Sequence, residues 1–260
     1  MDEPIDQQGI ARARALLATA RAVVVLTGAG VSAESGIPTF RDALTGVWSR
    51  FRPEDLATRE AFLRDPARVW AWYAERRATV ARVAPNAGHH ALAKIEADSA
   101  AKGIEFTLVT QNVDGLHHAA GSRRIHELHG NIRRVKCFDH GHAAVAWDES
   151  GETPPRCAAC GSRLRPDVVW FGEMLPEGAL EHALEASRRC DVFLSVGTSG
   201  LVEPAASLAH AAAEAGAAVI EVNPQRTPLT ARATIALSGT AATVLPLLAG
   251  SAGYVAPRGL

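Results

Sequence analysis

Four short runs of apolar and β-branched residues constrain the fold of this chain more than any other feature. They read RAVVVLTGAG (21–30), EFTLVT (105–110), DVFLSVGTS (191–199) and AAVIEVN (217–223). Near-continuous apolar runs are typical of strands that are covered by helices on both faces. Helical spacing precedes the first run, and a segment with an early proline and a final glycine separates the last two. The pattern predicts an α/β fold with a Rossmann-like, doubly wound parallel sheet.

Two stretches interrupt this alternation of strands and helices. Residues 43–100 contain tryptophan-rich helical sequence, and residues 132–166 contain short pieces broken by proline and glycine around cysteines. Neither stretch supplies another buried parallel strand, so both are predicted to be insertions that form a smaller, helical and zinc-ribbon-type domain. The Rossmann-like domain is then expected to comprise residues 1–42, 101–131 and 167–260.

Composition and charge exclude several kinds of partner. The 260 residues are 47% hydrophobic and 21% charged, which is ordinary for a globular protein, and the net charge is −1. This balance gives no electrostatic reason to expect a nucleic acid or an anionic membrane as partner. The first residues lack the basic start and apolar run of a secretory signal, and no stretch has the roughly 20 apolar residues of a membrane span. We therefore expect a cytoplasmic monomer with reduced thiols.

A glycine-rich loop, TGAGVSAESGIPTFR (27–41), follows the first predicted strand. Gly28 and Gly30 would allow backbone N–H groups and a helix N-terminus to approach a phosphate closely. The spacing is not G-x-G-x-x-G, and no ribose-binding acid follows a second strand about 20 residues on, so an ordinary dehydrogenase fingerprint is absent. A plain turn is the alternative for this loop.

Polar residues also gather after the second predicted strand. Gln111, Asn112 and Asp114 emerge at its carboxyl end, where doubly wound folds bind their ligands. His129 follows in IHELHG, just before a glycine. The alternatives are a helix-capping role for Asp114 and a surface position for His129. Four further histidines lack such a context and are expected to be structural or solvent-facing: His89, His90, His117 and His118.

Six segments together carry a resemblance to a known family. In chain order they are GAGVSAESGIPTFR, TQNVDGLH, ELHG, VVWFGE, VGTS and VNP. Over roughly residues 9–249 the chain resembles the sirtuins, which are NAD-dependent protein-lysine deacylases, and it is most similar to the bacterial, desuccinylase type. The resemblance implies that NAD is consumed as a co-substrate, and that the products are free lysine, nicotinamide and O-acyl-ADP-ribose.

The resemblance also implies which residues bind NAD. The GAG loop would hold the pyrophosphate, the PTFR segment would cover the reacting ribose, and later loops would hold the rest of the dinucleotide. The residues so implied are Gly28, Ala29, Gly30, Phe40, Arg41, Gln111, Gly197, Thr198, Ser199, Asn223 and Ala241.

Three residues would carry the chemistry. By resemblance, Asn112 and Asp114 line the nicotinamide pocket and help the glycosidic bond to ionise. The acyl oxygen of the modified lysine then attacks C1′ of the ribose. His129 corresponds to the general base that activates the ribose hydroxyl, and an imidazole with an ordinary pKa of about 6.5 suits that step.

Substrate-binding residues follow in the same way. Segments 168–173 and 199–205 resemble the two strands that sandwich a substrate peptide, and Val168 and Phe171 would line the acyl-lysine channel. Tyr73 and Arg76 share one helix face and resemble the pair that binds the carboxylate of succinyl- or malonyl-lysine.

Ala43 matches the small residue on the cofactor loop that leaves room for a longer acyl chain. The alternative for the Tyr73 and Arg76 pair is that Arg76 and Arg77 form a solvated helix face while Tyr73 lies in the core. The substrates are thus expected to be acetyl-lysine and also succinyl- or malonyl-lysine in proteins.

Cysteine spacing predicts a structural zinc site. Cys157 and Cys160 form a C-x-x-C pair, and Cys137 precedes them with His140 where the family has a second cysteine. These four are the predicted ligands, and His142 is a possible substitute, since thiolate and imidazole both suit zinc. A weakened or empty site is the alternative. The fourth cysteine, Cys190, is expected to pack in the core.

Two other functions stay open from the sequence. One is mono-ADP-ribosyl transfer, in which another nucleophile captures the ionised ribose. The other is a catalytically idle, NAD-sensing binding module. Asn112, Asp114 and His129 argue against the second, and the substrate-binding segments favour deacylation over the first.

Overall fold

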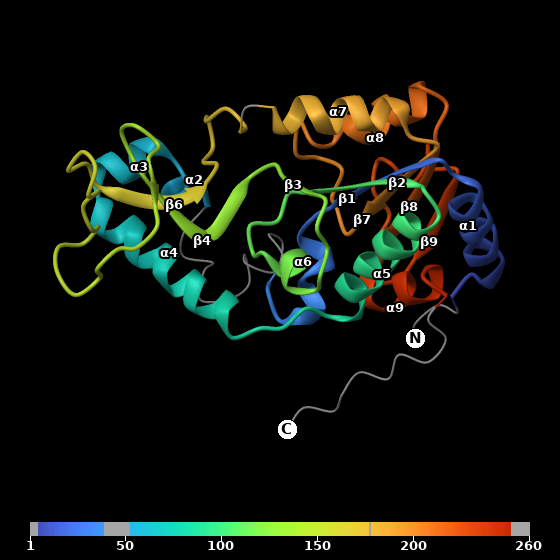
Figure 1. The fold of residues 1–260 in the computed structure, drawn as a ribbon, viewed down its shortest axis with the longest axis horizontal. Coiled ribbons are helices and arrows are strands. Elements are labelled where there is room, and N and C mark those ends of the chain that lie inside the picture. Colours follow the sequence, from blue (N-terminus) through green and yellow to red (C-terminus); the bar gives the residue numbers. More distant parts are fainter. Residues whose placement is uncertain (1–4, 39–52, 177, 251–260) are drawn as a thin grey trace.

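The computed structural model describes residues 5–38, 53–176 and 178–250, and in them two separate β-sheets (Figure 1). The larger sheet has six strands, and every neighbouring pair in it is parallel. Its strands are β1 (Ala22–Thr27), β2 (Glu105–Thr110), β3 (Ile125–Glu127), β7 (Val192–Val196), β8 (Ala218–Asn223) and β9 (Ile235–Ser238). The four strands predicted from the apolar runs are confirmed, and β3 and β9 are additional.

The strand order in the larger sheet is β3-β2-β1-β7-β8-β9. The chain builds outward from β1 in one direction and then returns to build outward from β7 in the other. This is the order of a Rossmann-like, doubly wound sheet, and its switch point lies between β1 and β7. Ligands of such sheets bind beyond the carboxyl ends of the strands at that point.

Helices cover both faces of the larger sheet. On one face lie α1 (Gln7–Thr19), α5 (Ala87–Ala101) and α9 (Ala241–Leu248), and on the other α7 (Ala179–Arg189) and α8 (Ser207–Glu214) (Figure 1). Side chains alternate between the faces along each strand, so that in β1 Val23 and Val25 enter the first core whereas Val24 and Leu26 enter the second. Burial on both faces explains why these strands are almost wholly apolar.

A smaller lobe stands beside the larger sheet (Figure 1). It contains α2 (Pro53–Leu56), α3 (Arg59–Arg64), α4 (Pro66–Ala81) and an antiparallel sheet of β4 (Gly130–Cys137), β5 (Ala143–Ala144) and β6 (Leu164–Val168). Its core includes Phe62, Tyr73 and Trp170. Both predicted insertions thus contribute to one lobe. The proposed domain boundaries stay a prediction, and α5, which ends the first insertion, packs against α9 on the larger sheet.

Three short helices complete the fold. These are η1 (Ala29–Val31), η2 (Ala33–Ser35) and α6 (Leu116–Ala119). They follow the carboxyl ends of β1 and β2, and they therefore position the residues beyond the switch point. Among the residues that the structure describes, no helix has both the length and the apolar character needed to cross a bilayer.

Candidate active site

Two glycine loops meet at the switch point between β1 and β7. The amide of Gly28 donates to the carbonyl of Val196 (3.1 Å), and the amide of Gly30 donates to that of Gly197 (2.9 Å). A Cβ atom on Gly30 would lie 2.8 Å from the Gly197 backbone, and one on Gly197, with φ +60°, would lie 2.6 Å from the amide nitrogen of Val31. Only glycine fits at either position. Glycine at these positions therefore allows the two loops to pack directly against each other at the carboxyl edge of the sheet, where ligands of doubly wound folds bind.

A chain of hydrogen-bonded side chains lies against these loops. Asn112 Nδ2 donates to the carbonyl of Gly28 (3.1 Å) and to Ser32 Oγ (3.1 Å), and Ser32 Oγ donates to Asp114 Oδ2 (2.8 Å). The other Asp114 oxygen accepts from the amide of Leu116 (2.8 Å). Burial raises the pKa of Asp114 in spite of these hydrogen bonds. The sequence indicated Asn112 and Asp114, and the structure adds Ser32 as their link.

His129 lies beyond the end of β2, between β3 and β4. Its Nδ1 is 2.9 Å from the carbonyl oxygen of Gln111, which can only accept, so Nδ1 carries the proton. The Nε2 atom is then an unprotonated acceptor. Burial lowers the pKa of His129, while the hydrogen bond from the ring to Gln111 raises it. The neutral form therefore prevails at neutral pH, and the free nitrogen can accept a proton.

Two buried histidines support this network, although they carried no predicted role. His89 is 0% exposed; its Nδ1 accepts from the amide of Asn86 (3.3 Å), so its Nε2 donates to Ser32 Oγ (3.3 Å). His117 lies with its Nε2 2.9 Å from Thr27 Oγ1. Burial lowers the pKa of His89 to about 4 and that of His117 to about 3. Asn86 and His89 form a helix N-terminal capping box, which was the available signal in the sequence.

The loops after β7 and β8 lie beside the glycine loops. Asn223 Nδ2 donates to the carbonyl of Thr198 (2.7 Å), and Thr198 Oγ1 is 3.1 Å from Ser195 Oγ. Ser199 Oγ accepts from the amide of Leu201 (3.3 Å). These contacts join two of the predicted NAD-binding segments. Ala241 is the first residue of α9 and is buried.

The predicted substrate segment runs from the end of β6. The amide of Val169 donates to the carbonyl of His129 (2.9 Å), which places the start of this segment next to the predicted base. Phe171 donates its amide to the carbonyl of Ala57 (2.9 Å) and leaves 47% of its surface exposed. On the second predicted segment, Leu201 is 66% exposed. Exposed apolar side chains on both segments are suited to contact with a peptide.

Tyr73 and Arg76 lie on α4, one turn apart. Tyr73 is buried in the core cluster that contains Val168 and Trp170, and its Oη accepts from Trp170 Nε1 (3.0 Å). Burial raises the pKa of Tyr73 to about 12. The Arg76 guanidinium lies 4.8 Å from the Trp72 ring centroid, and within the described ranges it forms no ion pair. The structure thus brings together Tyr73, Val168 and Arg76, and Arg76 forms no ion pair with any described carboxylate.

Arg77 differs from Arg76 in its surroundings. It pairs with Glu149 (3.0 Å), and its guanidinium lies 4.8 Å from the Trp70 ring centroid and 5.9 Å from that of Trp147. Arg77 therefore ties the loop after β5 to α4. Among the described residues Arg77 thus has a carboxylate partner, whereas Arg76 has none.

A cysteine and histidine cluster lies at the far end of the small lobe. One potential ligand atom from each of Cys137, His140, His142 and Cys160 lies within 4.8 Å of all the others. The sulfur atoms of Cys137 and Cys160 are 3.9 Å apart, as are Cys157 Sγ and His142 Nδ1. Zinc bound tetrahedrally to sulfur and nitrogen separates its ligand atoms by roughly 3.3–3.8 Å. The cluster is therefore compatible with structural zinc.

The cluster has more candidate ligands than zinc needs. His142 is among the four mutually close residues, and Cys157 lies beside it. The amides of His140 and His142 both donate to Cys137 Sγ (3.3 Å each). Cys190, by contrast, is buried in the core between the larger sheet and α7, as expected.

Three of the predicted residues, Phe40, Arg41 and Ala43, lie outside the described residues. Their predicted roles in covering the ribose and in making room for the acyl chain stay predictions.

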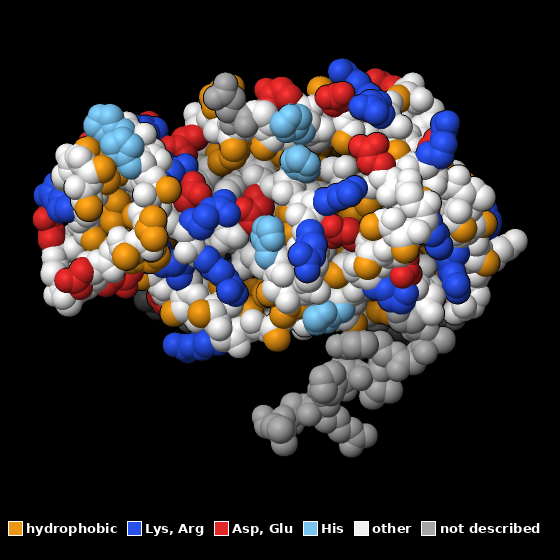
Figure 2. All heavy atoms as spheres, viewed as in Figure 1, with side chains coloured by type: hydrophobic (Ala, Val, Ile, Leu, Met, Phe, Trp, Pro, Cys, Tyr) orange, Lys and Arg blue, Asp and Glu red, His pale blue; other side chains and the backbone are white. Residues whose placement is uncertain are grey.

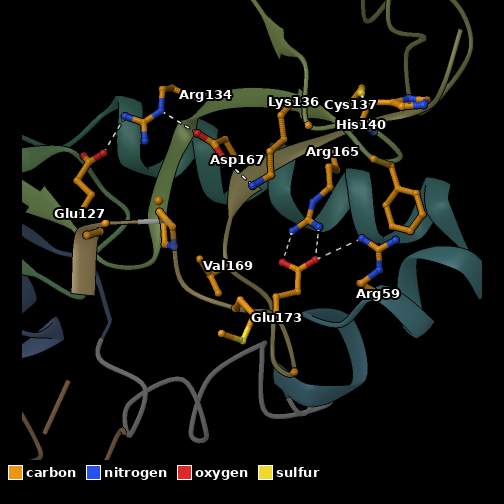
Figure 3. Close-up of a pocket in the computed structure, with 18 of the residues that line it drawn as sticks. Arg59, Glu127, Arg134, Lys136, Cys137, His140, Arg165, Asp167, Val169 and Glu173 are labelled. Atoms are coloured by element: carbon orange, nitrogen blue, oxygen red, sulfur yellow. Dashed lines mark hydrogen bonds and ion pairs between the residues drawn. The ribbon is translucent and has the colours of Figure 1, made fainter. Parts of the chain in front are cut away.

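A polar cleft of about 790 Å³ lies elsewhere, between β3, β4, β6 and the start of α7. Figure 2 shows basic and acidic side chains interleaved between the small lobe on the left and the rest of the molecule. Arg134 pairs with Glu127 and Asp167, and the Glu173 carboxylate faces both Arg165 and Arg59 (Figure 3). These charges satisfy one another, and none of the predicted catalytic or NAD-binding residues lines the cleft. The chemistry of the site therefore belongs to the switch point.

Comparison with known proteins gives a consistent result. Residues 28–204 match the model of the Sir2 family. A protein from Ralstonia nicotianae named NAD-dependent protein deacylase is 53% identical over 244 residues, which cover 94% of this chain and 97% of the relative. A protein of the same name from Thermus thermophilus is 53% identical over 236 residues, covering 91% and 92%.

Solved structures agree with the sequence matches. A Sir2 homologue in complex with NAD has a TM-score of 0.84 and 45% identity, with 92% of each chain covered. A Sir2 complex with a p53 peptide and NAD+ has a TM-score of 0.78 and 32% identity, covering 89% of this chain and 93% of that one. Both similarities extend over the larger sheet and the small lobe together.

Proposed function

The chain belongs to the Sir2 family, and we propose that it removes acyl groups from protein lysines in an NAD-dependent reaction, including acyl groups that end in a carboxylate. The family match, the relatives named NAD-dependent protein deacylase and the NAD complex of a similar structure support the reaction class. Arg76, which forms no ion pair with a described residue and lies one helical turn from Tyr73, supports the choice of acyl group.

NAD supplies a ribose whose bond to nicotinamide can break, so that the oxygen of an acyl-lysine amide can take the vacated position. Asn112 and Asp114 would hold the nicotinamide end, because they lie in the hydrogen-bonded chain against the Gly28 loop. The paired loops of Gly30 and Gly197 would lie against the pyrophosphate, because they meet at the carboxyl edge of the sheet at its switch point.

His129 would act as the base. Its Nε2 is unprotonated because Nδ1 donates to the Gln111 carbonyl, and burial keeps the ring neutral. A neutral imidazole that is held in one orientation can take the proton of a ribose hydroxyl without a preceding rearrangement. The amide of Val169, which donates to the His129 carbonyl, ties this base to the segment that would carry the peptide.

The substrate peptide would add as a strand between segments 168–173 and 199–205. Main-chain hydrogen bonds supply affinity in this mode of binding, with little dependence on sequence. The exposed Phe171 and Leu201 would flank the peptide, and the modified lysine would enter beside Val168. A similar structure contains a p53 peptide, which accords with this proposal.

A carboxylate on the acyl group would meet Tyr73 and Arg76. Tyr73 keeps its proton at neutral pH because burial raises its pKa to about 12. A guanidinium can donate two charge-assisted hydrogen bonds to one carboxylate, and Arg76 has no competing acid in the described part of the chain. This free pair of donors is the observation that carries the proposed preference for succinyl- and malonyl-lysine.

Zinc would hold this part of the small lobe together through the predicted ligands Cys137, His140, Cys157 and Cys160. His142 is the substitute ligand, and it stands in place of Cys157 in the group of four mutually close residues. It would have a structural role, because Cys137 ends β4, whereas His129 precedes the opposite end of that strand.

A direct test compares three peptides of one sequence that carry acetyl-, succinyl- or malonyl-lysine, each with and without NAD. Mass spectrometry follows both the peptide and the nucleotide products. We expect all three groups to be removed only with NAD, with the carboxylated groups preferred in kcat/KM. Removal of acetyl alone would contradict the proposed acyl preference, and transfer of ADP-ribose to the peptide would contradict deacylation.

A further inference from the structure

The hydrogen bond between Trp170 and Tyr73 has a direction that chemistry fixes. Trp170 Nε1 lies 3.0 Å from Tyr73 Oη, and both side chains are buried. An indole nitrogen is only a donor, so the tyrosine oxygen must be the acceptor. The phenolic O–H of Tyr73 is therefore left to donate elsewhere.

No acceptor for this proton is found in the described part of the chain. Tyr73 Oη has its hydrogen bond from Trp170, and no described residue accepts one from it. Arg76, which follows one helical turn later, also lacks an acceptor there. Two neighbouring groups thus offer donors, in a region where a buried donor without a partner is costly. A ligand group that only accepts hydrogen bonds would satisfy both.

Trp170 cannot easily turn away from Tyr73. The guanidinium of Arg165 lies 3.3 Å from the Trp170 ring centroid. The ring centroids of Phe62 and Trp170 are 5.4 Å apart. The Trp170 amide donates to the Glu173 carboxylate (2.9 Å), which is itself paired with Arg165. Figure 3 shows this pair of Arg165 and Glu173 together with Arg59. The hydrogen bond from the Trp170 amide fixes its backbone, and Arg165 and Phe62 pack against its ring.

Arg165, which lies over the Trp170 ring, also contacts the predicted acyl channel. Arg165 Nη2 donates to the carbonyl of Val168 (2.7 Å), and Val168 shares a core cluster with Tyr73 and Trp170. Val113, which lies between Asn112 and Asp114, packs against that cluster, as does Ile37. The Trp170 and Tyr73 pair is therefore continuous with the switch point through packed side chains.

We propose that Trp170 is a specificity-determining positioning residue, which donates to Tyr73 Oη and so commits the Tyr73 hydroxyl to donate to the end of the acyl group. A tyrosine hydroxyl without this constraint can turn to donate or to accept. Because its oxygen already accepts a hydrogen bond from the indole, the Tyr73 hydroxyl favours acyl groups that end in a hydrogen-bond acceptor, above all a carboxylate. Accepting one hydrogen bond also strengthens the bond that the same hydroxyl donates. The inference rests on the proposed acyl preference.

A double-mutant cycle tests it. The variants are Trp170→Phe, Tyr73→Phe and the two combined, assayed with succinyl-lysine and acetyl-lysine peptides of one sequence. On the succinyl peptide we expect kcat/KM to fall about 10- to 100-fold for Tyr73→Phe and about 3- to 10-fold for Trp170→Phe. The loss should lie in KM, because the end of the acyl group is bound alike before and during the reaction.

The combined variant gives the sharpest result. Because Trp170 acts through the Tyr73 hydroxyl, we expect the double variant to be no worse than Tyr73→Phe alone. The ratio of kcat/KM on the succinyl peptide to that on the acetyl peptide should fall in both single variants, since acetyl does not reach this hydroxyl. Equal losses on both peptides, or losses that multiply in the double variant, would show that Trp170 only fills space and would overturn the inference.

Two further measurements separate the loss of the N–H group from the loss of packing, and the failure of this inference from the failure of the proposed acyl preference. Trp170→Phe removes packing as well as the N–H group, so a second variant carries 3-benzothienylalanine at position 170, which keeps the shape and replaces N–H by sulfur. It should reproduce the selective loss with an unchanged melting temperature, and full succinyl activity in it would contradict the proposal. A wild-type protein that removes acetyl but neither succinyl nor malonyl would defeat the acyl preference and this inference together, whereas a failed cycle with active wild type would defeat only the inference.

Discussion

His129 donates from Nδ1 to the carbonyl oxygen of Gln111 at 2.9 Å, and this single bond decides which ring nitrogen is free. Gln111 follows β2 directly, and its own amide donates to the carbonyl of Thr27 on β1 (3.0 Å). The orientation of His129, the proposed base, is therefore set by the sheet that carries the proposed NAD site. Gln111 thus links β1, through its amide, to the ring of His129, through its carbonyl.

The pH dependence of the reaction should reflect His129. Because burial lowers its pKa, the neutral form is already dominant below pH 6.5. We expect kcat/KM to fall on the acid side only, with an apparent pKa below 6.5, in assays from pH 5 to pH 8. His129→Ala should reduce kcat by about 10²- to 10⁴-fold without loss of the folded state. An acid limb centred above pH 7 would contradict the assignment.

Arg76→Met and Arg77→Met form a matched pair on α4. We expect the first to lower kcat/KM about 10- to 100-fold on succinyl- and malonyl-lysine peptides and to leave acetyl-lysine largely unaffected, because it removes hydrogen bonds to a charged group. The second should instead lower the free energy of unfolding by about 1–2 kcal/mol, since Arg77 holds Glu149 and lies against two tryptophans. Steady-state kinetics and urea denaturation measure the two effects. An equal loss on all peptides for Arg76→Met would reject its role.

Stability should depend on pH through the buried histidines. The pKa values of His89 and His117 in the folded protein, about 4 and about 3, lie below the ordinary value of 6.5. Between the folded pKa values and pH 6.5, the unfolded chain therefore binds more protons than the folded protein. The free energy of unfolding is then highest above pH 6.5 and declines as the pH falls toward 4. We expect a loss on the order of a few kcal/mol over that range.

Urea denaturation at several pH values checks this dependence. His117→Gln keeps a hydrogen-bonding group near Thr27 but cannot titrate, so its stability should vary less with pH than that of the wild type. His210→Gln is the control, because that ring lies near the surface beside Arg232. Identical slopes for all three proteins would show that buried histidines do not set the acid sensitivity.

The metal cluster should affect stability and leave catalysis largely unchanged. We expect about one zinc per chain by elemental analysis, and a lower melting temperature after chelation, as a structural zinc stabilises the fold that supplies its ligands. Cys137→Ser should abolish zinc binding, whereas Cys190→Ser should not, because Cys190 lies in a different core. Zinc retention in Cys137→Ser would disprove this ligand set.

The sequence predicted the larger sheet well because its central strands are buried on both faces. Such burial requires unbroken apolar runs, and β1, β2, β7 and β8 have them. It could not predict β3, which has three residues and only partly buried side chains, or β9, in which buried and exposed residues alternate. The edges of a sheet carry a weaker pattern than its centre.

The candidate site was predicted in part for a similar reason. Asn112, Asp114 and His129 follow strands or precede a glycine, and these positions can be recognised along the chain. Ser32, His89 and Trp170 act through partners that are 57 to 97 residues away in the sequence. Contacts over such separations arise only when the sheet has formed, so spacing does not indicate them, although the capping box marks His89 as a residue at a helix N-terminus.

The central claim is that the protein frees lysine only in a reaction that consumes NAD. The most direct measurement incubates the protein with NAD and an acyl-lysine peptide, and quantifies free lysine peptide, nicotinamide and acylated ADP-ribose in one mass-spectrometric experiment. We predict equal amounts of the three products, and no nicotinamide release without the acylated peptide. Deacylation that proceeds without NAD, or that yields the free acid with no loss of NAD, would contradict the account.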